Sequence, residues 1–420
     1  MLLTFGGWYV DCLPVYMIIM EASMFSKGAI EWIHQAASIQ RWNDHLRPAE
    51  LTELDKQAHK MIIAYVIARY ESESGSHVFD WIKLIEGGII EFLHRVVVTD
   101  IKPPVFHKIM KEKGNELNRW VLQELQGDIN TIAGGFSDKF EEYFFNENYS
   151  VVEKRILRAA HYLATNWEFR IIYPGNSFMQ DIDKTKGEIE AQIEKHNDLV
   201  GVQKILLHRD ISGFINLCGQ LRLQQRWAQT PRIPHTSVLG HMLIVAILSY
   251  FCSMEAGFTR QRIYNNFFAS LFHDLPEVLT RDIVSPLKRS VEGLDDIIKE
   301  YEKLQAEEKI YPLIPESWHS EIRYFTENEF TSKIMRDGNI EYDIPIEEMN
   351  TTYNHDKYNP LDGIMLKGCD DLAAFIEASL SIKYGIKPEA LENGRRSIYD
   401  KYKSRKIGNL DFGMVFDYFN

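Results

Sequence analysis

Four residues in the second half of this chain have side chains that bind divalent metal ions. His241 begins an apolar run, and the adjacent pair His273 and Asp274 ends another. Asp370 follows about a hundred residues later. Two imidazoles and two carboxylates suit Mn²⁺, Fe²⁺, Co²⁺, Ni²⁺ or Zn²⁺ better than a metal that prefers thiolates. Four protein ligands leave room for water and substrate, and the metal would make hydroxide available near neutral pH. The set therefore predicts one catalytic divalent metal ion.

Each of these residues also has a purely structural explanation. A histidine that opens an apolar helix, such as His241, is compatible with a hydrogen-bonded core residue. Asp370 is compatible with the N-cap of the following helix, and Asp274 with a cap that works together with Glu277. The metal prediction therefore depends on the ordered occurrence of all four residues, and on the sequence Leu-Pro-Glu-Val-Leu-Thr-Arg-Asp after Asp274.

Helices are the elements expected to position these ligands. Helical periodicity dominates, and it predicts helices over residues 214–227, 241–254, 263–272 and 371–382. Segments that alternate with a period of two are scarce, so the predicted fold class is all-α. The ligands lie on or at the ends of these helices, and a helical bundle can bring such side chains together in its core.

Composition limits the classes of partner. The chain has 420 residues, of which 45% are hydrophobic, enough for two domains or one large one. A net charge of −13 and the lack of a basic patch interleaved with aromatic residues argue against nucleic-acid binding. The four cysteines show no CxxC spacing, which is typical of a reducing cytoplasm. We therefore expect a cytoplasmic protein that does not bind nucleic acid.

The first 24 residues form an apolar N-terminal extension of uncertain role. A Gly-Gly pair, Asp11 and Pro14 interrupt it, and it has no basic start. A signal peptide needs a positive start, and a membrane span needs roughly 20 uninterrupted apolar residues. We expect no membrane span, which leaves open a membrane-touching amphipathic segment or a translation start at Met20 or Met24.

Short matches in the same order relate the two halves of the chain. Gln-Arg-Trp occurs at residues 40–42 and 225–227, and an apolar run follows both His59 and His241. The interval from His59 to Asp100 is 41 residues, and so is the interval from His241 to Asp282. Ala-His-Tyr-Leu-Ala at 160–164 resembles Cys-Asp-Asp-Leu-Ala at 369–373. Repeats of this kind indicate a tandem duplication.

The first copy lacks the metal-ligand set in this register. Phe92 takes the place of Asp274, and Arg95 takes the place of Glu277. A phenylalanine cannot bind a metal, and an arginine cannot act as a carboxylate base. The first copy is therefore interpreted as a degenerate scaffold. A shifted register, or a weak metal site, stays open; the residues of that weak site would be His59, Glu91 and His161.

The repeat and a charged, proline-free stretch over residues 183–197 predict the domain organisation. The predicted parts are the extension 1–24, a degenerate domain 25–181, a connecting helix 182–207, and a catalytic domain 208–420 with an insert around 310–360.

Residues 208–385 resemble the HD-domain metal-dependent phosphohydrolases, and most closely the bacterial 5′-deoxynucleotidase branch. The resemblance rests on Arg226-Trp227, on His241, on the stretch from His273 to Asp282, and on residues 367–377. It implies two tandem all-α HD-type domains, the first of them degenerate. It also implies hydrolysis of the phosphomonoester of deoxynucleoside 5′-monophosphates through a metal-bound hydroxide.

The resemblance assigns a role to each matching residue. The metal ligands would be His241, His273, Asp274 and Asp370, and Asp274 also counts as catalytic. Glu277 would position or deprotonate the attacking water, or protonate the leaving ribose oxygen.

The resemblance also implies a substrate-binding set. Arg226 would hold the phosphate with its guanidinium fork, and Trp227 would pack near the sugar and help exclude a 2′-hydroxyl. Asp282 would hydrogen-bond the sugar, and Lys288 would contact the phosphate. Arg226 and Trp227 are equally compatible with a helix-end pair, and Lys288 with a solvated side chain.

The chain departs from that branch in its first copy and in its insert over residues 316–358. The insert could cover the pocket, mediate assembly or change the substrate. A dNTP or an alarmone therefore stays open as substrate, as does a metal- or nucleotide-binding regulatory module without turnover. The expected partner is a small-molecule nucleotide, and the assembly is either a monomer with an internal pseudo-dimer or a homodimer.

Overall fold

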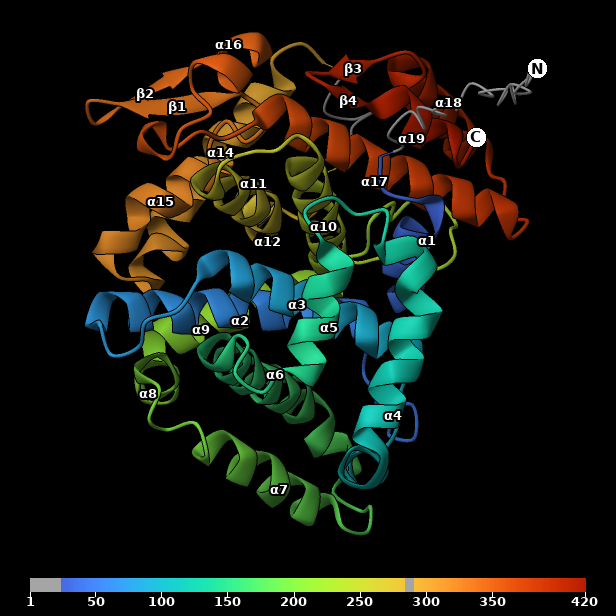
Figure 1. The fold of residues 1–420 in the computed structure, drawn as a ribbon, viewed down its shortest axis with the longest axis vertical. Helices are drawn as coiled ribbons and strands as arrows, with labels where there is room; N and C mark the ends of the chain where they lie inside the picture. The colour runs from blue at the N-terminus through green and yellow to red at the C-terminus, as the bar shows by residue number, and fades with distance from the viewer. Residues whose placement is uncertain (1–23, 284–290) are drawn as a thin grey trace, which may run out of the picture.

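The computed structural model describes residues 24–283 and 291–420, and these form a helical protein (Figure 1). The predicted all-α class is confirmed, because the described strands are short and form two small hairpins. The helices of the first half are α1 (Lys27–Gln35), α2 (Glu53–Ser74), α3 (Trp81–Val98), α4 (Pro103–Ile129), α5 (Phe136–Phe145), α6 (Val151–Ile172), α7 (Ile182–Glu194) and α8 (Val200–Leu207).

The second half carries the remaining helices and all four named strands. Its helices are α9 (Arg209–Gln220), α10 (Val238–Glu255), α11 (Arg260–Phe272), α12 (Glu277–Thr280), α14 (Leu294–Lys309), α15 (Glu316–Thr326), α16 (Ile346–Thr351), α17 (Gly363–Lys383), α18 (Glu389–Tyr402) and α19 (Phe412–Asp417). Strand β1 (Lys333–Arg336) pairs antiparallel with β2 (Asn339–Tyr342), and β3 (Lys406–Ile407) with β4 (Leu410–Asp411).

Helix α10 lies at the centre of the core. It packs against α2 of the first half and against α11 and α17 of the second. Its length and apolar composition would allow a membrane span, but nearly all of its residues are buried inside the protein. The Ser237 hydroxyl caps it by accepting a hydrogen bond from the Gly240 amide. The cap fixes the start of α10 three residues before His241.

Two local features recur in the two halves. An isolated bridge joins Gln40 to Thr52, and another joins Gln225 to Ser237. The indole N–H of Trp42 donates to Glu168 at 2.9 Å, as the indole N–H of Trp227 donates to Glu377 at 3.0 Å. Both tryptophans have a positive φ, 53° and 58°. These paired features support the proposed duplication.

The same features align α2 with α10 in a register that differs from the one the sequence intervals predict. The bridges align Thr52, the N-cap of α2, with Ser237, the N-cap of α10. Lys56 is then the fourth residue of its helix, as His241 is of α10. In this alignment Lys56 takes the place of His241, whereas the equal 41-residue intervals of the sequence paired His59 with it.

Three predicted helix boundaries are wrong. The helix expected over 214–227 ends at residue 220 and continues only as a 3₁₀ turn to Leu223. The Arg226 amide then bonds the Thr236 carbonyl, and the left-handed Trp227 turns the chain away from a helix. The expected connecting helix 182–207 is two helices, α7 and α8, and α17 begins eight residues before the predicted start at 371.

The insert joins the two halves through α15. The indole of Trp318, which is fully buried, donates to Glu73 of α2 at 2.7 Å. Glu321 accepts a hydrogen bond from Tyr65 at 2.6 Å and pairs with Arg69 at 2.8 Å. This part of the insert is therefore a buried structural element.

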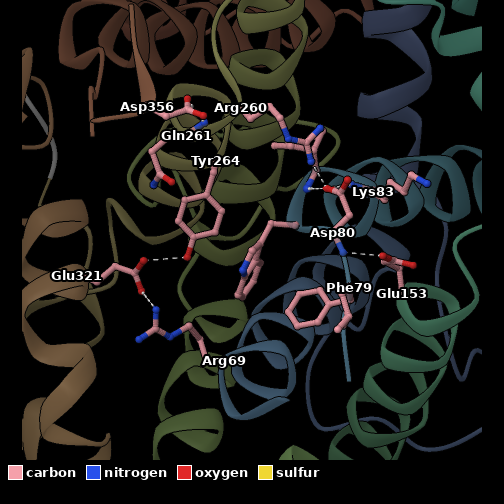
Figure 2. A pocket seen from close by; sticks show the side chains of 13 residues that line it. Arg69, Phe79, Asp80, Lys83, Glu153, Arg260, Gln261, Tyr264, Glu321 and Asp356 are labelled. Atoms are coloured by element: carbon pink, nitrogen blue, oxygen red, sulfur yellow. Dashed lines mark hydrogen bonds and ion pairs between the residues drawn. The ribbon is translucent and has the colours of Figure 1, made fainter. Parts of the chain in front are cut away.

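A cavity of about 780 Å³ lies along the same junction (Figure 2). Its charged groups largely pair with one another: Arg69 with Glu321, and Arg260 with Asp80. It contains none of the residues that the sequence predicts for catalysis or metal binding.

Candidate metal centre

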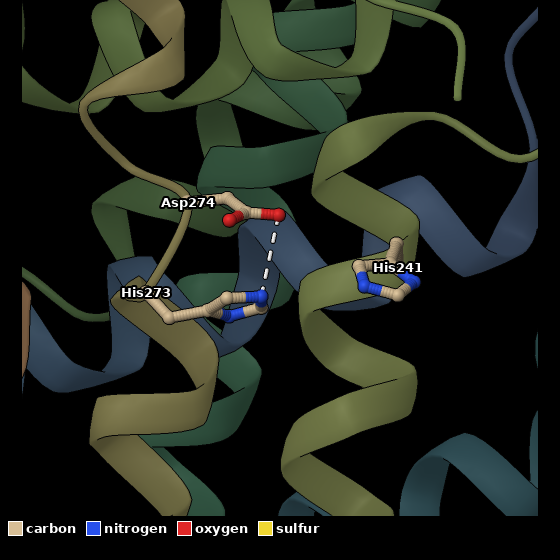
Figure 3. A group of neighbouring side chains, drawn as sticks. All are labelled: His241, His273 and Asp274. Carbon is tan, nitrogen blue, oxygen red and sulfur yellow. Dashed lines mark ion pairs between the residues drawn. The ribbon is translucent and has the colours of Figure 1, made fainter. Parts of the chain in front are cut away.

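Three of the four predicted ligands meet at one point (Figure 3). His241, His273 and Asp274 each offer one ligand atom, and these atoms all lie within 4.8 Å of one another. His241 stands in the first turn of α10, and His273 is the C-cap of α11. Because α10 and α11 pack side by side, the beginning of one helix and the end of the other share a site.

The ring of His273 is oriented by its own helix. Nδ1 lies 2.7 Å from the Ser270 carbonyl oxygen and donates to it, which leaves Nε2 free to bind a metal. Nε2 and Asp274 Oδ2 lie 3.2 Å apart as an ion pair, and neither buried atom has a hydrogen-bond partner in the part of the chain that the structure describes. Burial alone would lower the pKa of His273, but the Asp274 carboxylate outweighs it and raises the pKa to about 9.

Asp370 lies against this group from α17. Its Oδ1 is 2.8 Å from His241 Nε2, and its Oδ2 accepts a hydrogen bond from Lys367 at 2.6 Å. It is not among the three residues whose ligand atoms lie within 4.8 Å of one another. Burial would raise the pKa of Asp370, but Lys367 and the hydrogen bond from His241 hold it well below its usual range. Asp370 is inside α17, so it is not an N-cap.

Glu377 stands behind His241 and was not singled out for a role from the sequence. Its Oε1 is 3.4 Å from His241 Nδ1 and accepts a hydrogen bond from the Thr236 hydroxyl at 2.9 Å. A carboxylate on the far nitrogen of a metal-binding histidine fixes the ring and its tautomer. The signal was spacing, because Glu377 follows Asp370 by seven residues and two helical turns return to the same face.

Arg226 lies between the two carboxylates of the site. Its Nη1 is 3.5 Å from Asp274 Oδ2, and its Nη2 is 3.9 Å from Asp370 Oδ1. Burial would lower the pKa of Arg226, but the surrounding carboxylates raise it, so the guanidinium stays charged. Its Nε is buried without a hydrogen-bond partner among the described residues. A phosphate oxygen could satisfy that nitrogen.

The remaining predicted residues lie at the edge of the described region. Glu277 is buried and begins α12, and its backbone carbonyl accepts from Gln224. Trp227 and Asp282 are half-buried, and Asp282 is one of the groups that raise the pKa of Arg226. Lys288 lies outside the described residues, as does nearly all of the extension 1–24.

The residues present fit a divalent metal ion. Two imidazoles and a carboxylate converge here, and three of their atoms (His241 Nδ1, His273 Nε2 and Asp274 Oδ2) have no hydrogen-bond partner among the described residues. Such a donor set suits Mn²⁺, Fe²⁺, Co²⁺, Ni²⁺ or Zn²⁺. His241, His273 and Asp274 would hold the ion, and Asp370 is adjacent to them.

The first half has lysine side chains in the corresponding place. Lys56 Nζ lies 2.5 Å from His161 Nδ1, and Lys60 Nζ lies 2.5 Å from Glu91 Oε2. His59 instead contacts the Ile215 carbonyl. The weak site that was left open is therefore not formed, and among the described residues a three-ligand group occurs only in the second half.

Comparisons with known proteins agree with this geometry. Residues 218–399 match the HD domain family. A 5′-deoxynucleotidase of Vibrio vulnificus is 27% identical over 130 residues, which are 29% of this chain and 64% of that protein. A 5′-deoxynucleotidase of Pectobacterium atrosepticum is 26% identical over 128 residues, 29% of this chain and 62% of that protein. The match thus spans less than two thirds of either relative.

Proposed function

From the HD domain that residues 218–399 form, we propose that this protein is a metal-dependent phosphohydrolase. Its proposed substrates are deoxynucleoside 5′-monophosphates, which it cleaves to a nucleoside and phosphate. The observation that carries the proposal is the convergence of His241, His273 and Asp274 beside Arg226. Two relatives named as 5′-deoxynucleotidases support the choice of substrate.

The reaction breaks one bond between phosphorus and the 5′-oxygen. A divalent ion at this site would lower the pKa of a bound water and draw charge from the phosphoryl group. Arg226 binds phosphate oxygens through its free Nε and its two terminal nitrogens. Glu277 takes the proton of the attacking water or supplies a proton to the leaving 5′-oxygen.

The supporting side chains keep the site ready for this reaction. Glu377 and the Ser270 carbonyl hold the two imidazoles in place. Lys367 keeps Asp370 ionised, because the ammonium group lies 2.6 Å from the carboxylate. The substrate therefore meets preorganised charges, which is how such sites stabilise a charged transition state.

The test is a panel of nucleotides with each of the five candidate metals. Purified protein is incubated with deoxy- and ribonucleoside monophosphates, dNTPs and an alarmone, and the products are identified. We expect phosphate from the deoxynucleoside monophosphates. Release of triphosphate or pyrophosphate would contradict this substrate class, and nucleotide binding without any product would favour a regulatory module.

Glu277→Gln is the matched variant for the same assay. It removes the proton acceptor but keeps the size of the side chain, so we expect a loss of roughly 10²–10⁴ in rate. Metal content, measured on the same sample by elemental analysis, should stay at the level of the parent protein. A variant that loses its metal would show that Glu277 is a ligand instead.

A further inference from the structure

We propose that Phe330 forms the wall of the substrate site against which the base of a nucleotide packs. Phe330 belongs to the insert, where the chain departs from the 5′-deoxynucleotidases that it resembles. The inference rests on the proposed function, because it assumes that the phosphate of a nucleotide binds at the metal centre.

Phe330 lies next to a metal ligand. Its ring centre is 5.9 Å from that of His273, with the ring planes inclined by 59°. The ammonium group of Lys367 lies 4.6 Å from the centre of the same ring. Phe330 is only half-buried, whereas His273 is buried. A partly exposed aromatic residue therefore lies beside the place where a phosphate would bind.

The segment that carries Phe330 is fixed to α17. At Gly363, an added Cβ would lie 2.2 Å from the Thr331 amide nitrogen and 2.3 Å from the Phe330 carbonyl carbon. The backbone approaches the helix so closely that only glycine fits there. A bridge joins Lys333 and Leu361 through two backbone hydrogen bonds of 3.0 and 2.9 Å.

A buried lysine, Lys333, bonds to the beginning of the same segment. The Lys333 ammonium donates to the Glu327 carbonyl at 2.6 Å, although burial lowers its pKa to about 8. The turn over residues 327–331 is thus tied at both ends. A wall that is already ordered costs little conformational entropy when a ligand packs against it.

The order of groups in a nucleotide assigns the base to Phe330. On the proposed function the phosphate occupies the metal centre and Arg226, so the sugar and the base extend away from it past the neighbouring side chains, of which Phe330 is an aromatic one. The base is the remaining flat, apolar group, and aromatic rings bind bases by stacking without strong preference among them. We therefore expect similar affinity for all four bases.

Phe330→Ala tests the contact when two substrates are compared. One is a deoxynucleoside 5′-monophosphate, and the other is 2-deoxyribose 5-phosphate, which has the same phosphate and sugar but no base. The variant should lose about tenfold or more in kcat/KM for the nucleotide, the scale of one lost stacking contact. The base-free substrate should change by less than about twofold, and Phe330→Trp should keep most of the nucleotide activity.

Binding to the Mn²⁺-loaded protein is measured in parallel by calorimetry in the Glu277→Gln background, which is expected to keep the metal and to slow cleavage, so the comparison does not depend on turnover. Phe178→Ala is the control, because Phe178 is 74% exposed and precedes α7, far from α17 in Figure 1. If Phe330→Ala weakens the binding of both ligands equally, Phe330 has a structural role. If the parent protein binds both ligands with equal affinity, the base makes no contact that contributes to binding. Either result overturns the inference. A parent that binds the nucleotide through its base but never cleaves it would refute the proposed function alone.

Discussion

One backbone carbonyl and one carboxylate lie against the two histidines of the candidate metal centre. The Ser270 carbonyl accepts a hydrogen bond from His273 Nδ1, and Glu377 faces Nδ1 of His241. The ligands themselves could be predicted from residue type and order. The seven-residue spacing also places Glu377 on the helix face of Asp370, but its approach to His241, like that of Phe330 to His273, arises only when segments far apart in the sequence meet.

Glu377→Gln should weaken metal binding. Loss of the carboxylate removes the group that orients His241, and changes of this kind typically cost 10–100-fold in metal affinity. Metal titration by calorimetry measures the effect. Glu168→Gln is a matched control, since Glu168 also accepts an indole N–H in a buried place but belongs to the first half. An equal loss of affinity in both variants, each shown to be folded by circular dichroism, would contradict a specific role for Glu377.

At the scale of elements, the sequence predicted which segments are helical better than where they end. The apolar runs of α10 and α11 were found because their burial leaves a clear pattern. The turn after residue 220 was missed, since Trp227 adopts a left-handed conformation that its residue type does not favour. The N-caps Thr52 and Ser237 also revise the repeat, because they pair Lys56 with His241.

This alignment gives a reason why, among the described residues, a candidate metal centre is found in only one half. The structure places Lys56 and Lys60 beside His161 and Glu91 in the first half. Lysine side chains thus fill the place where the second half would bind an ion. The two lysines thus give a physical reason for the predicted lack of a ligand set in the first half. The duplication itself stays a proposal.

The two halves of the molecule share one buried core. Arg222, which follows α9, pairs with Glu168 of α6 at 3.0 Å, and Arg41 pairs with the same carboxylate at 2.9 Å. Helix α15 of the insert adds contacts to α2. These contacts indicate that the halves unfold together.

The Glu168 pairs predict how stability depends on pH. Burial would raise the pKa of Glu168, but Arg41 and Arg222 outweigh it and lower the pKa. A depressed carboxyl pKa stabilises the fold above its unfolded value of about 4.3, and this contribution is lost as the pH falls below that value. Breaking the buried pairs by Glu168→Gln should cost about 3–5 kcal/mol at pH 7.

Urea denaturation of parent and Glu168→Gln protein between pH 7 and pH 3 measures this difference. The difference in unfolding free energy should shrink as the pH falls below about 4.3. A difference that stays constant with pH would show that the cost comes from packing instead of charge.

The central claim is that His241, His273 and Asp274 hold the one metal ion with which this protein hydrolyses a phosphomonoester. The most direct test measures bound metal and phosphate release from deoxynucleoside 5′-monophosphates, in parent protein and in Asp274→Ala. We expect the parent to bind about one equivalent and release phosphate, and the variant to lose both, because a ligand and its charge are gone. Full turnover by Asp274→Ala would contradict the account.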